Sequence, residues 1–153
     1  MKTLILGGIR SGKSRLAEQL ATRCALPVVY VATAEPKDEE MQQRIEAHRA
    51  RRPQHWRLIE EPIALGSILS RQPDHGCTVV ECLTLWLSNL LLLDEQNAFA
   101  RERWSLFRAL SDFRGELILV SNEANMGVVP ADALSRRFCD EAGRLHQELA
   151  HRC

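Results

Sequence analysis

The chain has 153 residues, of which 45% are hydrophobic, enough for a single compact domain spanning 1–153 with a sizeable core. Its 20 basic and 20 acidic side chains cancel, so the formal net charge is zero. This balance excludes a uniformly positive surface for binding nucleic acid or an anionic membrane. Any anionic ligand must therefore be bound by a local site.

The cysteines indicate a reducing compartment. Five are present, an odd number, and no two form a C-x-x-C pair, which argues against a disulfide framework and against a zinc site. The longest apolar run, residues 82–93, falls short of the roughly 20 residues that a membrane span needs. We therefore expect a soluble, cytoplasmic protein without a membrane span.

Short apolar runs alternate with stretches of helical periodicity, a pattern typical of a parallel sheet covered by helices. The predicted strands are residues 2–6, 28–33, 56–60, 78–81 and 117–121, with 56–60 at an edge. The predicted helices are residues 13–24, 38–51, 64–71, 83–93, 99–113 and a last helix that Pro130 opens. We therefore expect an α/β fold with a mostly parallel sheet and helices on both faces.

Some apolar side chains are predicted to pack in the core. The last helix carries a stripe at spacings of four, four, three and four, formed by Leu134, Phe138, Ala142, Leu145 and Leu149. The tryptophans are predicted to pack rather than to stack on bases, and they are Trp56, Trp86 and Trp104. The leucines of 83–93 fit either a core or an interface.

A phosphate-binding loop is the clearest motif. Residues 7–14 read GGIRSGKS and match G-x-x-x-x-G-K-[ST] between a predicted strand and a predicted helix. Such a loop points its backbone N–H groups at phosphate oxygens, and the helix N-terminus adds positive potential. The alternative is a glycine-rich turn that binds nothing. The predicted nucleotide-binding residues are Gly7, Gly8, Ile9, Arg10, Ser11, Gly12, Lys13 and Ser14.

Two side chains of this loop have predicted chemical roles. Lys13 would reach the terminal phosphates, and the Ser14 hydroxyl would ligate Mg²⁺. A phosphate loop also needs an acidic partner at the end of another strand to hold Mg²⁺ through water. Glu81 is the first candidate and Glu123 the second, because both follow predicted strands whose carboxyl ends meet at the ligand-binding edge of such a sheet.

One histidine lies in an informative place. Met41, Ile45 and His48 share one face of the helix predicted over 38–51, and a histidine on an apolar face is usually structural. Its basic neighbours suggest another interpretation, because guanidinium groups bind triphosphate well. The pattern alone leaves a catalytic histidine and a solvated basic face both open. The neighbours are Arg44, Arg49, Arg51 and Arg52.

Longer matches decide between these interpretations. They are GGIRSGKSRLAE (7–18), YVATAE (30–35), DEEMQQRIEAHRARRPQHW (38–56), ECLTLWLSNLL (81–91) and SNEANMGVVPADALSRRFCDEAGRLHQELA (121–150). Together they resemble the bifunctional adenosylcobinamide kinase / adenosylcobinamide-phosphate guanylyltransferase family of cobalamin synthesis over nearly the whole chain. The combination is far more specific than a phosphate loop alone.

The resemblance implies a P-loop NTPase-like (RecA-like) fold and two reactions. ATP or GTP phosphorylates adenosylcobinamide, and GTP then transfers GMP to that phosphate through a guanylyl-histidine, giving adenosylcobinamide-GDP. By position in R-I-x-x-H the nucleophile is His48, whose neutral imidazole can attack phosphorus at cytoplasmic pH. The resemblance also implies a homotrimer. The further guanine-nucleotide residues that it implies are Ala32, Thr33, Ala34, Arg49, Ala50, Arg51, Arg52, Glu60 and Glu81.

The chain departs from the family pattern at four places. Some members carry two adjacent histidines where this chain has Ala47 and His48, so the nucleophile is assigned by spacing alone. The usual N-E-x-G-x-G has Asn125 at its first later glycine, and the usual G-R-x-N-Q has His146 at its asparagine. The resemblance also implies a closing strand after the last helix, whereas the printed sequence ends at Cys153. Two alternatives therefore stay open: a kinase-only member, and a GTP-binding interaction module without a small-molecule acceptor.

Overall fold

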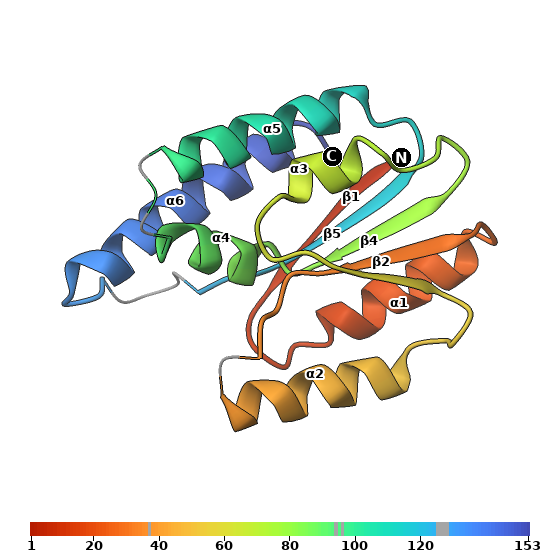
Figure 1. Ribbon diagram of the computed structural model, residues 1–153, viewed down its shortest axis with the longest axis horizontal. Helices are drawn as coiled ribbons and strands as arrows, with labels where there is room; N and C mark the ends of the chain where they lie inside the picture. The colour runs from red at the N-terminus through yellow and green to blue at the C-terminus, as the bar shows by residue number, and fades with distance from the viewer. Residues whose placement is uncertain (37, 94, 96, 125–128) are drawn as a thin grey trace.

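Five parallel strands form one sheet in the order β1-β5-β4-β2-β3 (Figure 1). The computed structural model describes residues 1–36, 38–93, 95, 97–124 and 129–153. The strands are β1 (Lys2–Gly7), β2 (Val28–Ala32), β3 (Arg57–Glu60), β4 (Cys77–Glu81) and β5 (Glu116–Asn122). All five predicted strands are present, and β3 lies at an edge as expected.

Helices lie on both sides of this sheet, which confirms the predicted α/β fold. In the view of Figure 1, α1 and α2 lie below the sheet, and the other helices lie above it. The helices are α1 (Lys13–Arg23), α2 (Glu39–Arg51), α3 (Leu65–Leu69), α4 (Leu83–Leu91), α5 (Ala98–Asp112) and α6 (Ala133–Ala150). Each corresponds to a predicted helix, and its bounds differ from the predicted ones by a few residues.

The sheet has a hydrophobic core on each face, which explains the continuous apolar strands. Val29 and Val31 of β2 pack with residues of α3, α4, α5 and α6, whereas Val28 and Tyr30 pack on the face that α1 covers. Strands buried on both faces lose the alternation of polar and apolar residues. Leu83, Leu87 and Leu90 lie in the larger core, so these leucines of α4 are core residues.

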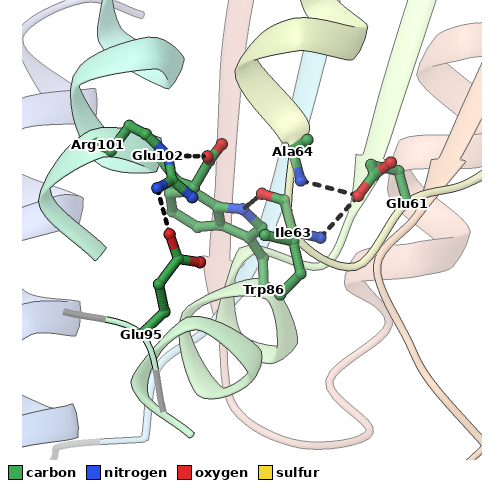
Figure 2. A network of polar contacts seen from close by, with 7 residues as sticks. All are labelled: Glu61, Ile63, Ala64, Trp86, Glu95, Arg101 and Glu102. Atoms are coloured by element: carbon green, nitrogen blue, oxygen red, sulfur yellow. Dashed lines mark hydrogen bonds and ion pairs between the residues drawn. The ribbon is translucent and has the colours of Figure 1, made fainter. Parts of the chain in front are cut away.

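Polar contacts hold the loop between β3 and α3 against α4, as Figure 2 shows. A carboxylate oxygen of Glu61 accepts hydrogen bonds from the backbone N–H groups of Ile63 and Ala64, at 3.0 and 2.8 Å. The indole N–H of Trp86 donates to the carbonyl of Ile63 at 2.7 Å. Trp86 is fully buried, so this bond satisfies its only polar group inside the core.

The last helix begins later than the sequence predicts. It starts at Ala133 rather than at Pro130, because the side chain of Asp132 accepts a hydrogen bond from the Ser135 N–H at 2.8 Å and caps the helix. The same hydrogen bond lowers the pKa of Asp132 below its usual value. Pro130 therefore precedes the cap and does not form the first helical turn.

Two packing predictions are wrong in part. Ala142, Leu145 and Leu149 lie in the core as expected, but Leu134 is 48% exposed because it lies in the first turn of α6, at its far end from the sheet (Figure 1). Trp104 is 62% exposed and its ring packs under the Arg108 guanidinium at 5.2 Å. Trp56 and Trp86 are buried as predicted.

Candidate active site

A cleft of about 520 Å³ lies at the carboxyl edge of the sheet and brings the phosphate loop and His48 together. Ligands of open α/β sheets bind at this edge. The sequence could not place α2 over the loop, because helix and loop are far apart along the chain. The predicted site residues that line the cleft are Ile9, Arg10, Ser11, Gly12, Lys13, Ser14, Ala32, Ala34, His48, Arg52, Glu60 and Glu81.

The phosphate loop has the backbone shape that its glycines predict. Gly12 adopts a φ of 90°, which favours glycine, and it caps α1 by accepting from the Leu16 N–H at 3.0 Å. A Cβ on Gly7 would lie 2.9 Å from Oγ of Ser11, so the loop folds closely over this position. Lys13 donates to the Gly8 carbonyl at 2.5 Å, which holds its ammonium group against the loop.

Glu81 is the centre of the polar contacts in the cleft. Its Oε1 accepts a hydrogen bond from the Ser14 hydroxyl and lies 3.7 Å from Nδ1 of His48. Its other oxygen, Oε2, accepts from the Tyr30 hydroxyl at 2.5 Å. One carboxylate therefore connects the phosphate loop to the histidine, and Tyr30 fixes which oxygen faces them both.

Tyr30 is itself held by aromatic and cationic neighbours. Its ring stacks on Trp56 with centroids 6.4 Å apart, and the Arg52 guanidinium lies 4.3 Å from its ring centroid. Burial, and next the neighbouring Glu81 carboxylate, raise the pKa of Tyr30 far above its usual value. The hydroxyl therefore keeps its proton and remains a donor to Glu81.

His48 faces the cleft, not a sealed core. It shares the cleft lining with Met41 and Ile45, the apolar residues of the predicted stripe, and its side chain is 37% exposed. Asp38 caps α2 by accepting from the Met41 N–H at 2.7 Å, which fixes where the helix starts. This stripe lines a ligand-sized space, so a substrate has access to the imidazole.

The basic residues around His48 separate into different environments. Arg52 lines the cleft and donates from Nε to the His48 carbonyl at 3.2 Å. Arg49 forms an exposed ion pair with Glu60 at 2.6 Å. Glu60 lines the cleft, whereas Arg49 does not. Ala50 is exposed on α2. The side chains of Arg44 and Arg51 lie outside the described part of the structure.

Several predicted site residues do not line the cleft. Gly7 and Gly8 are not among the residues that line the cleft, although the Gly8 carbonyl accepts a hydrogen bond from Lys13. Thr33 is fully buried and exchanges hydrogen bonds with the backbone of Cys82 at 2.7 and 2.8 Å. Thr33 therefore connects the chain after β2 to the chain after β4, and its buried side chain is not accessible to a nucleotide. Asn125 lies outside the described residues.

Glu123 occupies a different place from Glu81. One of its carboxylate oxygens lies 3.7 Å from Nδ1 of His146, and the residue is absent from the cleft lining. Of the two acidic candidates, Glu81 is thus the one that lines the cleft and contacts Ser14. His146 is buried, and burial lowers its pKa while the Glu123 carboxylate partly opposes this shift.

The cleft also contains residues that sequence reasoning missed as site residues. Tyr30 was predictable only as part of a buried strand, and its inward position beside Glu81 follows from the pairing of β2 with β4. Asn122 is the last residue of β5, as Glu81 is the last residue of β4, and a polar residue at a strand end was a usable signal. The missed lining residues are Arg15, Tyr30, Cys82, Leu85, Val120 and Asn122.

The oxygen atoms beside the loop fit a magnesium ion. Ser14 and Glu81 provide a hydroxyl and a carboxylate in contact with each other. Mg²⁺ bound with a nucleotide takes one or two protein oxygens and completes its shell with water and phosphate. The described residues contain no group of three or more His, Cys, Asp or Glu side chains that could hold a metal by themselves.

The helices also bear on the membrane prediction. Within the described residues, no helix combines the length and the apolar character needed to cross a bilayer.

Comparison with known proteins identifies the family. The family model described as cobinamide kinase / cobinamide phosphate guanyltransferase matches residues 3–153. A Pseudomonas aeruginosa protein named bifunctional adenosylcobalamin biosynthesis protein CobP is 56% identical, over 100% of this chain and 89% of its own length. Proteins from Escherichia coli and Salmonella typhimurium named bifunctional adenosylcobalamin biosynthesis protein CobU are each 38% identical, over 98% of this chain and 90% of their own lengths. The chain belongs to the cobinamide kinase / cobinamide phosphate guanyltransferase family.

Proposed function

We propose that this protein phosphorylates adenosylcobinamide with a nucleoside triphosphate and then transfers GMP from GTP to the product through a guanylyl intermediate on His48. One observation carries the proposal: the phosphate loop and His48 line one cleft and meet at Glu81. The names of the relatives, which describe bifunctional proteins of adenosylcobalamin biosynthesis, support two activities in one chain.

In the kinase step, the loop holds the triphosphate for attack by the acceptor hydroxyl. The hydroxyl oxygen forms a bond to the γ-phosphorus and loses its proton to water, and the bond from that phosphorus to the β–γ bridging oxygen breaks and releases the nucleoside diphosphate. Backbone N–H groups of the loop and the Lys13 ammonium stabilise the negative charge on the phosphate oxygens. Mg²⁺, held by Ser14 and Glu81, would neutralise further charge when it is bound.

In the transfer step, His48 acts as the nucleophile. The Glu81 carboxylate favours a proton on the facing Nδ1, which leaves Nε2 with a free electron pair. Nε2 attacks the α-phosphorus of GTP, the bond to the pyrophosphate oxygen breaks, and a phosphoramidate forms. A phosphate oxygen of adenosylcobinamide phosphate then attacks the same phosphorus and releases His48, giving adenosylcobinamide-GDP.

The remaining cleft residues have supporting roles in this proposal. The Arg52 guanidinium neutralises charge as pyrophosphate leaves, since it lines the cleft beside His48. Ala32, Ala34 and Glu60 line the part of the cleft near α2, where the guanosine would lie. A cytoplasmic location belongs to the proposal through the number and spacing of the cysteines, and a homotrimer belongs to it through the family resemblance.

The test is product analysis with purified protein. Adenosylcobinamide, GTP and Mg²⁺ are incubated with the protein, and the corrinoid products are separated and weighed by mass spectrometry. The proposal predicts adenosylcobinamide phosphate first and adenosylcobinamide-GDP later, and neither when EDTA removes the metal. Phosphate product alone would indicate a kinase-only protein. GTP binding without either product would indicate an interaction module and would contradict the proposal.

A further inference from the structure

The cleft has two flanks on either side of Glu81. Strand order places β2 and β3 on one side of β4 and β5 on the other. His48, Arg52 and Glu60 line the flank over β2 and β3, whereas Leu85 and Asn122 line the flank formed by α4 and β5. These two flanks differ in chemistry, since the first carries charged side chains, whereas α4 and β5 contribute the uncharged Leu85, Val120 and Asn122.

The charged flank is where the nucleotide must lie if His48 attacks the α-phosphorus, a step that rests on the proposed function. The γ-phosphate then points away from His48 along the phosphate loop. An acceptor hydroxyl must approach this phosphorus from the side opposite the leaving nucleoside diphosphate. The flank left for the acceptor is the one that Leu85 and Asn122 line.

Asn122 is well placed to contact an acceptor. It ends β5 opposite Gly7, where the phosphate loop begins, and the next residue, Glu123, donates its N–H to the Gly7 carbonyl at 2.9 Å. The residue is partly exposed and lines the cleft. Its amide can both donate and accept a hydrogen bond, which suits a hydroxyl or an amide group on an uncharged acceptor.

A buried chain of side chains holds Asn122 in this position. The backbone N–H of Asn122 donates to Oγ1 of Thr84 at 2.6 Å, and this oxygen lies 3.1 Å from Oγ of Ser121. Oγ of Ser121 lies 2.8 Å from Nε2 of His146, whose Nδ1 faces Glu123. Ser121 and His146 are 1% and 7% exposed, so the chain is shielded from water and each bond restricts the next.

One assignment of hydrogen-bond donors and acceptors is consistent for the whole chain from His146 to the Asn122 backbone. If His146 carries its proton on Nδ1, facing the Glu123 carboxylate, Nε2 accepts from the Ser121 hydroxyl. The Thr84 hydroxyl then donates to Ser121 while its lone pair accepts from the Asn122 N–H. The end of β5 is thereby fixed from α6 through His146 and from α4 through Thr84.

We propose that Asn122, with Leu85, forms the acceptor-binding wall of the cleft, and that His146 is a positioning residue that holds Asn122 through Ser121 and Thr84. The ligand of this wall is the uncharged hydroxyl-bearing arm of the phosphoryl acceptor. The nucleotide does not contact it. Replacement of Asn122 therefore raises the KM for the acceptor more than the KM for GTP.

The experiment measures steady-state kinetics of the kinase step with adenosylcobinamide and GTP each varied. In Asn122→Ala the KM for adenosylcobinamide rises about tenfold, the loss expected for one hydrogen bond, while the KM for GTP changes by less than about twofold. His146→Ala gives a smaller rise in the same constant. His146→Gln restores it, because the glutamine amide reaches the place of Nε2 and can accept from Ser121. Ser121→Ala replaces His146→Ala if that variant does not fold.

Gln147→Ala is the matched control, since this exposed neighbour on α6 takes no part in the buried chain. An unchanged KM for adenosylcobinamide in Asn122→Ala, or an equal rise in the KM for GTP, would overturn the acceptor wall. A purely structural role of His146 predicts a lower melting temperature with both KM values unchanged, which would overturn its positioning role. Failure of the proposed function is distinguishable, because the wild-type protein would then form no phosphorylated corrinoid.

Discussion

Nδ1 of His48 lies 3.7 Å from Oε1 of Glu81, the same oxygen that accepts the hydrogen bond of Ser14. His48 of α2 and Ser14 of α1 thus face the same carboxylate oxygen, although they are far apart in the sequence. The phosphate loop and the imidazole are parts of one site for this reason. The opposite oxygen of Glu81 is held by Tyr30, so the position of the shared oxygen depends on the tyrosine.

Tyr30→Phe removes the hydroxyl that fixes Glu81 and keeps the ring that packs between Trp56 and Arg52. We expect the rate of His48 guanylylation to fall about tenfold, because a hydrogen bond to a charged group contributes on the order of 1.5 kcal/mol. Rapid-quench measurement of label transfer from GTP gives this rate. Trp56→Phe keeps an aromatic neighbour and the Tyr30 hydroxyl, and it serves as the control. Equal rates in Tyr30→Phe and wild type would remove Tyr30 from the account.

The sequence predicted most of the fold, because the signals are local. Continuous apolar strands and periodic helices identified all five described strands and six helices. It misplaced the start of α6, since Pro130 and the capping residue Asp132 are competing start signals only two positions apart. It also misjudged Trp104, because that prediction rested on residue type, whereas the buried face of α5 is formed by other residues, among them Leu106 and Ala109.

The site was predictable only in part. The loop motif identified the residues from Ile9 to Ser14, and the strand-end rule identified Glu81. Thr33 was predicted to bind nucleotide, yet its hydroxyl forms hydrogen bonds with the backbone of Cys82. This contact depends on how the ends of two strands pack together. Tyr30 and Asn122 were missed because their roles depend on which strands are neighbours in the sheet. Local sequence patterns do not predict strand order.

Gly66→Ala is expected to destabilise the protein by about 1–3 kcal/mol or more. A Cβ on this buried glycine would lie 2.4 Å from the backbone of Ser105, so α3 and α5 would have to move apart. Gly143→Ala is the matched control, because nothing lies within 4 Å of its added Cβ on α6. The control should gain roughly 0.5–1 kcal/mol from helix propensity.

Urea unfolding at neutral pH, followed by circular dichroism, measures both glycine variants. The predicted order of stability is Gly143→Ala above wild type and Gly66→Ala below it. Equal stability of Gly66→Ala and wild type would show that α3 and α5 do not pack as closely as the structure has them.

His146 makes the stability of the protein depend on pH. Burial lowers its pKa in the folded state, so below the unfolded value of about 6.5 the unfolded chain binds more protons than the folded one. Its contribution to the free energy of unfolding is therefore fully present above that value and is lost as the pH falls below it. His146→Gln, which does not titrate, should lack this loss.

Thermal unfolding between pH 5 and 8 measures the difference between the two proteins. The wild type should lose more stability than His146→Gln as the pH falls. His151→Gln is the control, because His151 is exposed and its replacement should leave the pH dependence unchanged. Parallel pH profiles for wild type and His146→Gln would contradict the buried position of the imidazole.

The central claim is that His48 takes up GMP in the cleft that holds the triphosphate. Protein incubated with Mg²⁺ and GTP labelled at the α-phosphate is denatured, digested and sequenced by mass spectrometry. The account predicts one guanylyl group on the peptide that contains His48, stable in alkali and lost in acid, and no label in His48→Ala. A wild-type protein that carries no label, or that carries it on another residue, would contradict the account.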